Sequence, residues 1–279
     1  LGTAGYSTDQ ELLWLRQTGL RFHPDITALF FYYIDVWYNA QSTYFDTPKP
    51  VFTFAGDSLV FHAPKIHERK KSAGSTPAEL SAIDWLKQHS RLYRLAERVA
   101  KQNSTLRSLA VRFGLAPLQQ EMYTTAGSAV IPAEFAVYRT PTSPDVAKAW
   151  SATERLLSLM KSDVDSSGGR FLIFNIPIRA QIYGNTASEG PIGTTPGWDL
   201  DLVDKQLQAI CTRDSIECVE PTEQYITVAH ALSKHRQRLY YTMDQHWNSN
   251  GHYLAAAILL PRLLDEIRAN PTCKSAGSQ

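Results

Sequence analysis

The chain has 279 residues, of which 43% are apolar and 20% are charged, so it can bury a substantial core. Its 28 basic and 27 acidic residues leave a formal charge of +1, which argues against a general nucleic-acid-binding protein because such proteins carry a basic excess. The longest dense apolar stretch, residues 26–36, contains Asp35 and is too short to cross a bilayer, so we expect no transmembrane segment.

The first predicted elements are a helix and a buried strand. Thr8 is a good N-cap for the helix, and Glu11 follows three residues later, as in a capping box. The continuous apolar run Ile26–Ile34 ends at Asp35 and is typical of a parallel strand buried on both faces. A helix followed by a buried strand indicates an α/β fold.

The later elements continue this alternation. Residues 51–61 predict two short strands around an Ala-Gly-Asp-Ser turn, and residues 114–144 predict an irregular excursion. Hydrophobic spacing predicts four further helices and two further strands: Glu79–Ala100, Ala147–Met160, Leu200–Cys211 and Tyr253–Arg268 as helices, and Arg170–Pro177 and Ile216–Val219 as strands. We therefore expect a three-layer α/β/α domain with a parallel sheet over residues 1–269, interrupted by an excursion at about 48–144. A disordered tail is expected over residues 270–279.

Basic residues gather in one part of the chain. Residues 62–112 hold 11 Lys and Arg against 4 Asp and Glu, a local charge of +7 that leaves −6 for the remainder. This pattern fits either a solvated helical face or a patch that faces an anionic partner or a lipid surface.

The three cysteines are too few for a disulfide scaffold, and no Cys/His metal spacing is present. Cys211 and Cys218 either form a bridge or remain as buried thiols, and the distance between them decides. A glycine-rich phosphate loop is also absent, which argues against nucleotide chemistry. We therefore expect neither a metal nor a cofactor.

The segment around residue 244 carries the most chemical information. Asp244 lies two residues before His246, just ahead of a predicted helix. The carboxylate in such a pair can orient the imidazole and leave its second nitrogen free as a general base. The spacing alone also fits a structural histidine near a helix N-terminus.

Two stretches resemble conserved blocks of the SGNH/GDSL hydrolases. Residues 244–252, Asp-Gln-His-Trp-Asn-Ser-Asn-Gly-His, resemble the last block, where the catalytic Asp and His lie before the C-terminal helix. Residues 1–13, Leu-Gly-Thr-Ala-Gly-Tyr-Ser-Thr-Asp-Gln-Glu-Leu-Leu, resemble the second block, and Gly5 matches the glycine that donates to the oxyanion. The resemblance implies catalytic roles for Asp244, His246 and Gly5. It covers nearly the whole chain in the family's order, although the middle of the chain matches more loosely than the two ends.

The chain departs from the family pattern in two ways. The nucleophile block, a Gly-Asp-Ser that precedes the glycine block in the family, is missing, and the chain opens at Leu1 without a methionine, so we expect that upstream sequence was removed or left out. Gly56-Asp57-Ser58 spells the motif, but its place in the family order is an excursion, so we interpret Ser58 as a chance match. The oxyanion-hole asparagine of the third block is replaced by Ile34, which has no donor.

Three hypotheses follow from the resemblance. The first is an SGNH-type ester hydrolase or O-acyltransferase whose nucleophile segment is absent from this chain, acting outside the cytoplasm on a small acyl ester or a glycan. The second is a non-catalytic SGNH-derived domain that serves as a binding module or as a subunit of a larger assembly. The third is an active enzyme that uses Ser58.

The hypotheses make geometric predictions. Asp244 and His246 should lie at the carboxyl end of the sheet near Gly5, with a carboxylate-to-imidazole hydrogen bond, and Ser58 should lie beyond hydrogen-bond reach of His246. Since the usual first strand is missing, we also expect an exposed sheet edge that a protein partner can complete.

Overall fold

The computed structural model describes residues 2–3, 5–44, 47–55, 58–64, 89–103, 105–106, 108–109, 123–184, 191–242 and 245–269. The chain forms two compact units. The first unit comprises residues 1–13, 33–157 and 185–203, and the second comprises residues 14–32, 158–184 and 204–279. The expectation of a single domain over residues 1–269 stays a prediction, and the expected tail at 270–279 lies outside the described residues.

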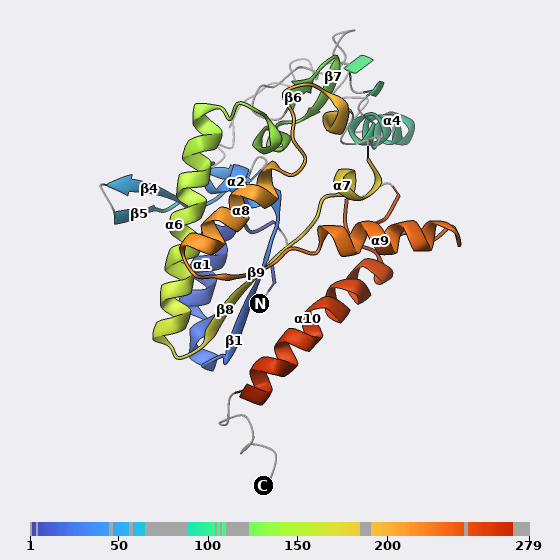
Figure 1. Cartoon of the computed structure of the whole chain (residues 1–279). Helices are drawn as coiled ribbons and strands as arrows, with labels where there is room; N and C mark the ends of the chain where they lie inside the picture. The colour runs from blue at the N-terminus through green and yellow to red at the C-terminus, as the bar shows by residue number, and fades with distance from the viewer. Residues whose placement is uncertain are drawn as a thin grey trace. The chain divides into compact units, whose positions relative to one another are not determined.

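A three-stranded parallel sheet lies at the centre of the second unit. Its strands are β1 (Ile26–Phe31), β8 (Arg170–Asn175) and β9 (Glu217–Val219), in the order β1-β8-β9 (Figure 1). β1 and β8 run in parallel register from Ile26 opposite Arg170 to Phe31 opposite Asn175. The prediction that these two apolar runs form adjacent parallel strands is therefore confirmed.

The two predicted strands differ in burial. Residues 171–175 of β8 are all buried, as expected for a strand covered on both faces. β1 lies at the edge of the sheet among the described strands, and its Ala28 and Phe30 are exposed. The expectation that residues 26–34 are buried on both faces is therefore wrong for β1, and the expectation that a sheet edge is exposed stays a prediction.

The end of β1 also differs from the prediction. The strand stops at Phe31, and helix α2 (Tyr33–Asn39) begins two residues later. Tyr33 and Val36 are buried at helical spacing, so the apolar character of the run continues across the change from strand to helix. Ile34 therefore lies in a helix rather than in a strand.

Helices make up most of the rest of the second unit. They are the last part of α6 (Pro144–Ser166), α7 (Arg179–Tyr183), α8 (Leu202–Arg213), α9 (Thr222–Ser233) and α10 (Ser249–Ala269), with the short 3-10 helix η1 (Gly19–Phe22) before β1. The expected helices at 147–160, 200–211 and 253–268 correspond to α6, α8 and α10. No helix was expected at α7 or α9.

Short antiparallel hairpins characterise the first unit. β4 (Val51–Ala55) pairs with β5 (Ser58–His62), as predicted, and the remaining pairs are β2 (Thr43–Tyr44) with β3 (Thr47–Pro48) and β6 (Tyr123–Ala126) with β7 (Ala129–Pro132). The last hairpin falls in the stretch expected to be irregular. The unit also contains two 3-10 helices, η2 (Ala133–Tyr138) and η3 (Ile192–Thr194), and part of α1 (Thr8–Gln17).

The predicted helix 79–100 is described only in part. Helix α4 (Arg91–Gln102) covers its second half and extends two residues beyond it, and residues 79–88 lie outside the described part of the chain. Taken together, the elements give a mixed α/β fold with a three-stranded parallel sheet, and the other described sheets are two-stranded antiparallel pairs.

A disulfide joins two elements of the second unit. Cys211 near the end of α8 bonds to Cys218 in β9, and their Cα atoms are 6.1 Å apart. That separation is within the usual range for a disulfide. The sequence left a bridge and two free thiols as alternatives, and the structure has the bridge.

Candidate functional site

Polar residues lie at the carboxyl edge of the parallel sheet. Tyr32 directly follows β1, Asn175 is the last residue of β8, and Glu220 directly follows β9. The carboxyl ends of parallel strands lie at one edge of a sheet, and in open α/β sheets this edge is where ligands bind. The edge is therefore the natural place to look for a site in the second unit.

The loop that carries His246 is tied to this edge. The Tyr32 hydroxyl donates to Gln245 Oε1 at 3.2 Å, which joins the residue between Asp244 and His246 to the end of β1. Tyr241 N donates to the carbonyl of His246 at 3.1 Å and closes the loop on itself. His246 is exposed, and Asp244 lies outside the described residues, so the hydrogen bond between the two stays a prediction.

A buried arginine holds the beginning of the same loop. Arg179, the first residue of α7, donates from Nη1 to the carbonyl oxygens of Tyr241 and Thr242 at 3.1 and 3.0 Å. Hydrogen bonds from a charged donor are stronger than those between neutral groups. Residues that follow β1 and β8 thus fix the loop at two points.

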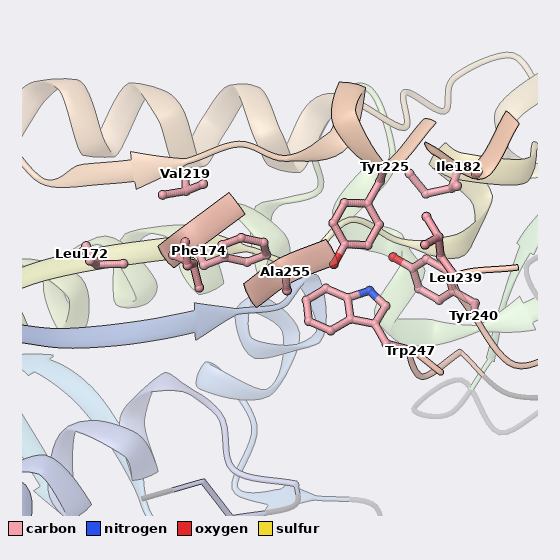
Figure 2. Packing of buried hydrophobic residues seen from close by; sticks show 11 residues of the cluster. Leu172, Phe174, Ile182, Val219, Tyr225, Leu239, Tyr240, Trp247 and Ala255 are labelled. Carbon is pink, nitrogen blue, oxygen red and sulfur yellow. The ribbon is translucent and has the colours of Figure 1, made fainter. Parts of the chain in front are cut away.

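An aromatic cluster packs where the loop ends (Figure 2). Trp247 stacks on Tyr225 at 5.4 Å between ring centroids and meets Phe174 of β8 edge to face at 6.0 Å. The Tyr225 hydroxyl donates to the carbonyl of Gly251 at 2.8 Å. This packing joins the sheet, α9 and the start of α10, and so fixes the point where the loop ends.

Gly251 is required by this close packing. A Cβ at this position would lie 2.4 Å from the carbonyl oxygen of Leu239 and 2.8 Å from Cβ of Trp247. Any side chain would push the start of α10 away from the residues that flank the loop.

The sequence analysis missed an acidic cluster at the same edge. Asn175 Nδ2 donates to Asp204 Oδ1 at 2.9 Å and to Glu220 Oε2 at 2.8 Å. Asp204 Oδ2 also accepts from Gln181 Nε2 at 2.8 Å and from the Thr222 hydroxyl at 3.2 Å. One buried amide therefore bridges two carboxyl groups that come from α8 and from the end of β9.

The environment of Glu220 favours its protonated form. Burial, together with the charge of Asp204, raises the pKa of Glu220 to about 7, and the hydrogen bond from Asn175 opposes the rise. Glu220 Oε1 is buried and has no hydrogen-bond partner. The sequence does contain a signal for this acidic cluster, because Asn175 and Glu220 are polar residues at the ends of predicted buried strands.

Gly5 lies in the first unit, whereas His246 lies in the second. The φ angle of Gly5 is +78°, in the left-handed region, and a Cβ at this position would lie 2.7 Å from Cε1 of Tyr44. Both constraints demand glycine at this position. The predicted proximity of Gly5 to His246 stays a prediction.

The helix that follows Gly5 starts one residue earlier than expected. Thr8 is the first helical residue rather than the N-cap, and its buried hydroxyl has no partner, so the predicted capping box is wrong. Ser7 precedes the helix instead, and its carbonyl accepts from Glu11 N at 3.0 Å. The Ser7 hydroxyl donates to Asp9 Oδ1 at 2.7 Å.

A buried ion pair anchors this helix. Lys49 Nζ bonds Asp9 Oδ2 and also donates to the carbonyls of Tyr38 at 3.0 Å and Pro50 at 3.1 Å. Both side chains are almost completely buried. Burial raises the pKa of Asp9 and lowers the pKa of Lys49, and the attraction between the two charges opposes both shifts.

Glu11 lies beside this pair. Burial, with the charge of Asp9, raises the pKa of Glu11 to about 8, so the group is protonated at neutral pH. The backbone N–H of Asp9 also donates to Asn39 Oδ1 at 3.1 Å, and Asn39 Nδ2 donates to the Thr153 hydroxyl at 2.9 Å. These contacts hold α1, α2 and α6 together within the first unit.

The two remaining candidate positions lie in the first unit. Ser58 is the first residue of β5 and stands opposite Ala55 in an antiparallel hairpin, and Gly56 and Asp57 lie outside the described residues. A hairpin strand is not the turn after a parallel strand that presents a nucleophilic serine. Ile34 lies in α2 and has no hydrogen-bond donor in its side chain.

No group of three or more His, Cys, Asp or Glu side chains within the described ranges is placed to hold a metal ion. We compared the chain with models of protein families, with curated proteins and with solved structures, and none of them matches it. The residues themselves therefore carry any argument about function.

Proposed function

We propose that this chain is an SGNH-type domain that carries the acid–base part of a serine ester hydrolase or O-acyltransferase site. The observation that carries the proposal is the anchoring of the Asp244-Gln245-His246 loop at the carboxyl edge of a parallel sheet, through Tyr32 and Arg179. An exposed imidazole at such an edge can reach a substrate.

Each residue has a definite role in the proposed reaction. A serine hydroxyl attacks the ester carbonyl while His246 takes its proton, and His246 then returns the proton to the departing alcohol. Asp244 orients the imidazole. The substrate class is a small acyl ester or a glycan ester, and the serine comes from a segment that these 279 residues do not contain.

The Cys211–Cys218 disulfide supports a location outside the cytoplasm, because disulfides persist mainly in oxidising compartments. The proposed site therefore acts in the periplasm or after secretion.

A second candidate is a non-catalytic SGNH-derived domain in a larger assembly. Ile34 favours it, since the loss of one oxyanion donor costs about 100- to 1000-fold in turnover. The place of β1 at the edge of the sheet among the described strands also favours it, because an edge strand can pair with a strand from a partner protein.

Labelling with a fluorophosphonate distinguishes these proposals from an enzyme that uses Ser58. We expect the 279-residue chain to remain unlabelled, because Ser58 lies in a hairpin strand and not in the turn after a parallel strand that presents a nucleophilic serine. Mass spectrometry of the digested protein measures the outcome. Stoichiometric labelling at Ser58 that is lost in both Ser58→Ala and His246→Ala would overturn the proposal.

A further inference from the structure

Helix α4 presents an apolar stripe to solvent. Leu92, Leu95 and Val99 are 78%, 58% and 38% exposed, and their spacing of three and four residues places them on one side of the helix. Isolated exposed leucines are common on proteins, but a row of them along one helix marks an interaction surface.

The same helix is basic. It contains four basic residues, Arg91, Arg94, Arg98 and Lys101, and one acidic residue, Glu97. Arg91 and Arg94 are exposed. At 100° per residue, both arginines lie to one side of the Leu92–Leu95–Val99 stripe rather than within it. An apolar stripe flanked by basic residues is typical of helices that lie in the interface of an anionic membrane.

The apolar surface continues past the end of α4. Leu106 and Leu109 are also exposed, and Asn103 Oδ1 accepts from the backbone N–H of Thr105 and Leu106 at 3.0 and 3.1 Å. Val130 N in β7 donates to the Ser108 hydroxyl at 2.9 Å, which fastens this stretch to the β6–β7 hairpin of the same unit.

We propose that α4 and the turn after it dock the protein onto an anionic lipid surface. The helix lies parallel to the membrane, with Leu92, Leu95 and Val99 among the acyl chains and Arg91 and Arg94 at the level of the phosphates. No helix in the described part of the chain is long and apolar enough to cross a membrane.

Charge favours a lipid surface over a protein groove, because the +7 charge of residues 62–112 complements an anionic headgroup layer. The proposal is independent of the acyl-transfer chemistry proposed above.

The test is cosedimentation of the 279-residue chain with vesicles of phosphatidylcholine alone or with 30% phosphatidylglycerol. We expect binding to the anionic vesicles, and about 25-fold weaker binding for Arg91→Gln/Arg94→Gln, since each basic residue contributes about fivefold at the surface. Leu92→Ser/Leu95→Ser should weaken binding at least as much, because the inserted apolar area is lost. Circular dichroism checks that these surface variants remain folded.

The matched control is Leu260→Ser/Leu264→Ser on α10. These two exposed leucines lie about one helical turn from each other, and they belong to the second unit. This variant should bind the anionic vesicles as the unmodified chain does. The proposal is wrong if the unmodified chain ignores anionic vesicles, if it binds both vesicles equally, or if the α4 variants bind like the unmodified chain. A self-association lost in Leu92→Ser/Leu95→Ser, without vesicle binding, would assign the stripe to a protein interface instead.

Discussion

Replacing Lys49 with methionine is expected to lower the free energy of unfolding by about 3–5 kcal/mol at pH 7. The substitution leaves the Asp9 carboxylate buried without its cation, and it also leaves the carbonyls of Tyr38 and Pro50 without their donor. Urea unfolding followed by tryptophan fluorescence measures the change, because Trp37, Trp150 and Trp198 belong to the same unit.

Two further variants make the result specific to the ion pair. Lys49→Met/Asp9→Asn should recover a large part of the loss, because no charge then remains buried. Lys148→Met, which removes an exposed lysine of α6, should change the free energy of unfolding by less than about 0.5 kcal/mol. A loss below 1 kcal/mol for Lys49→Met would contradict a structural role for the pair.

Replacing Glu220 with glutamine is expected to stabilise the protein at high pH and not at low pH. Burial raises the pKa of Glu220 from 4.5 to about 7, so the folded state retains a proton that the unfolded state releases. The stabilisation from this proton is complete below pH 4.5 and is lost as the pH rises through 7. Glutamine resembles the protonated carboxyl group in shape and cannot ionise.

The difference in unfolding free energy between Glu220→Gln and the unmodified protein should therefore grow by about 2–3 kcal/mol between pH 5 and pH 8.5. Denaturation curves at several pH values measure it. Glu223→Gln on the exposed side of α9 provides the control and should show no such trend. A difference that stays constant between pH 5 and pH 8.5 would show that the folded protein does not hold Glu220 protonated.

The sequence predicts best those elements in which local pattern and packing agree. β8 is a bounded apolar run whose residues 171–175 are all buried, and the two short apolar segments at 51–55 and 58–62 pair as an antiparallel hairpin. β1 begins where predicted, but Tyr33 and Ile34 continue the apolar pattern into α2, and hydrophobicity alone cannot mark the change. Helix α9 buries few residues, chiefly Tyr225 and Ala229, and so has only a weak periodic signal.

The candidate site divides in the same way. The loop with Asp244 and His246 is contiguous in sequence and could be found by its motif. The contacts of Tyr32 with Gln245 and of Asn175 with Asp204 and Glu220 join residues 213, 29 and 45 positions apart. Such contacts exist only because parallel strands bring their carboxyl ends to one edge, and no local pattern specifies which side chains meet there.

We propose that His246 serves as the base for a serine that these 279 residues do not contain. Fluorophosphonate labelling of the translation product of the complete gene tests this role, with the labelled peptide identified by mass spectrometry. We predict one labelled serine, outside residues 1–279, whose labelling is lost in His246→Ala while the free energy of unfolding changes by less than about 0.5 kcal/mol. Labelling at Ser58, labelling that persists in His246→Ala, or the absence of any labelled serine would contradict the claim.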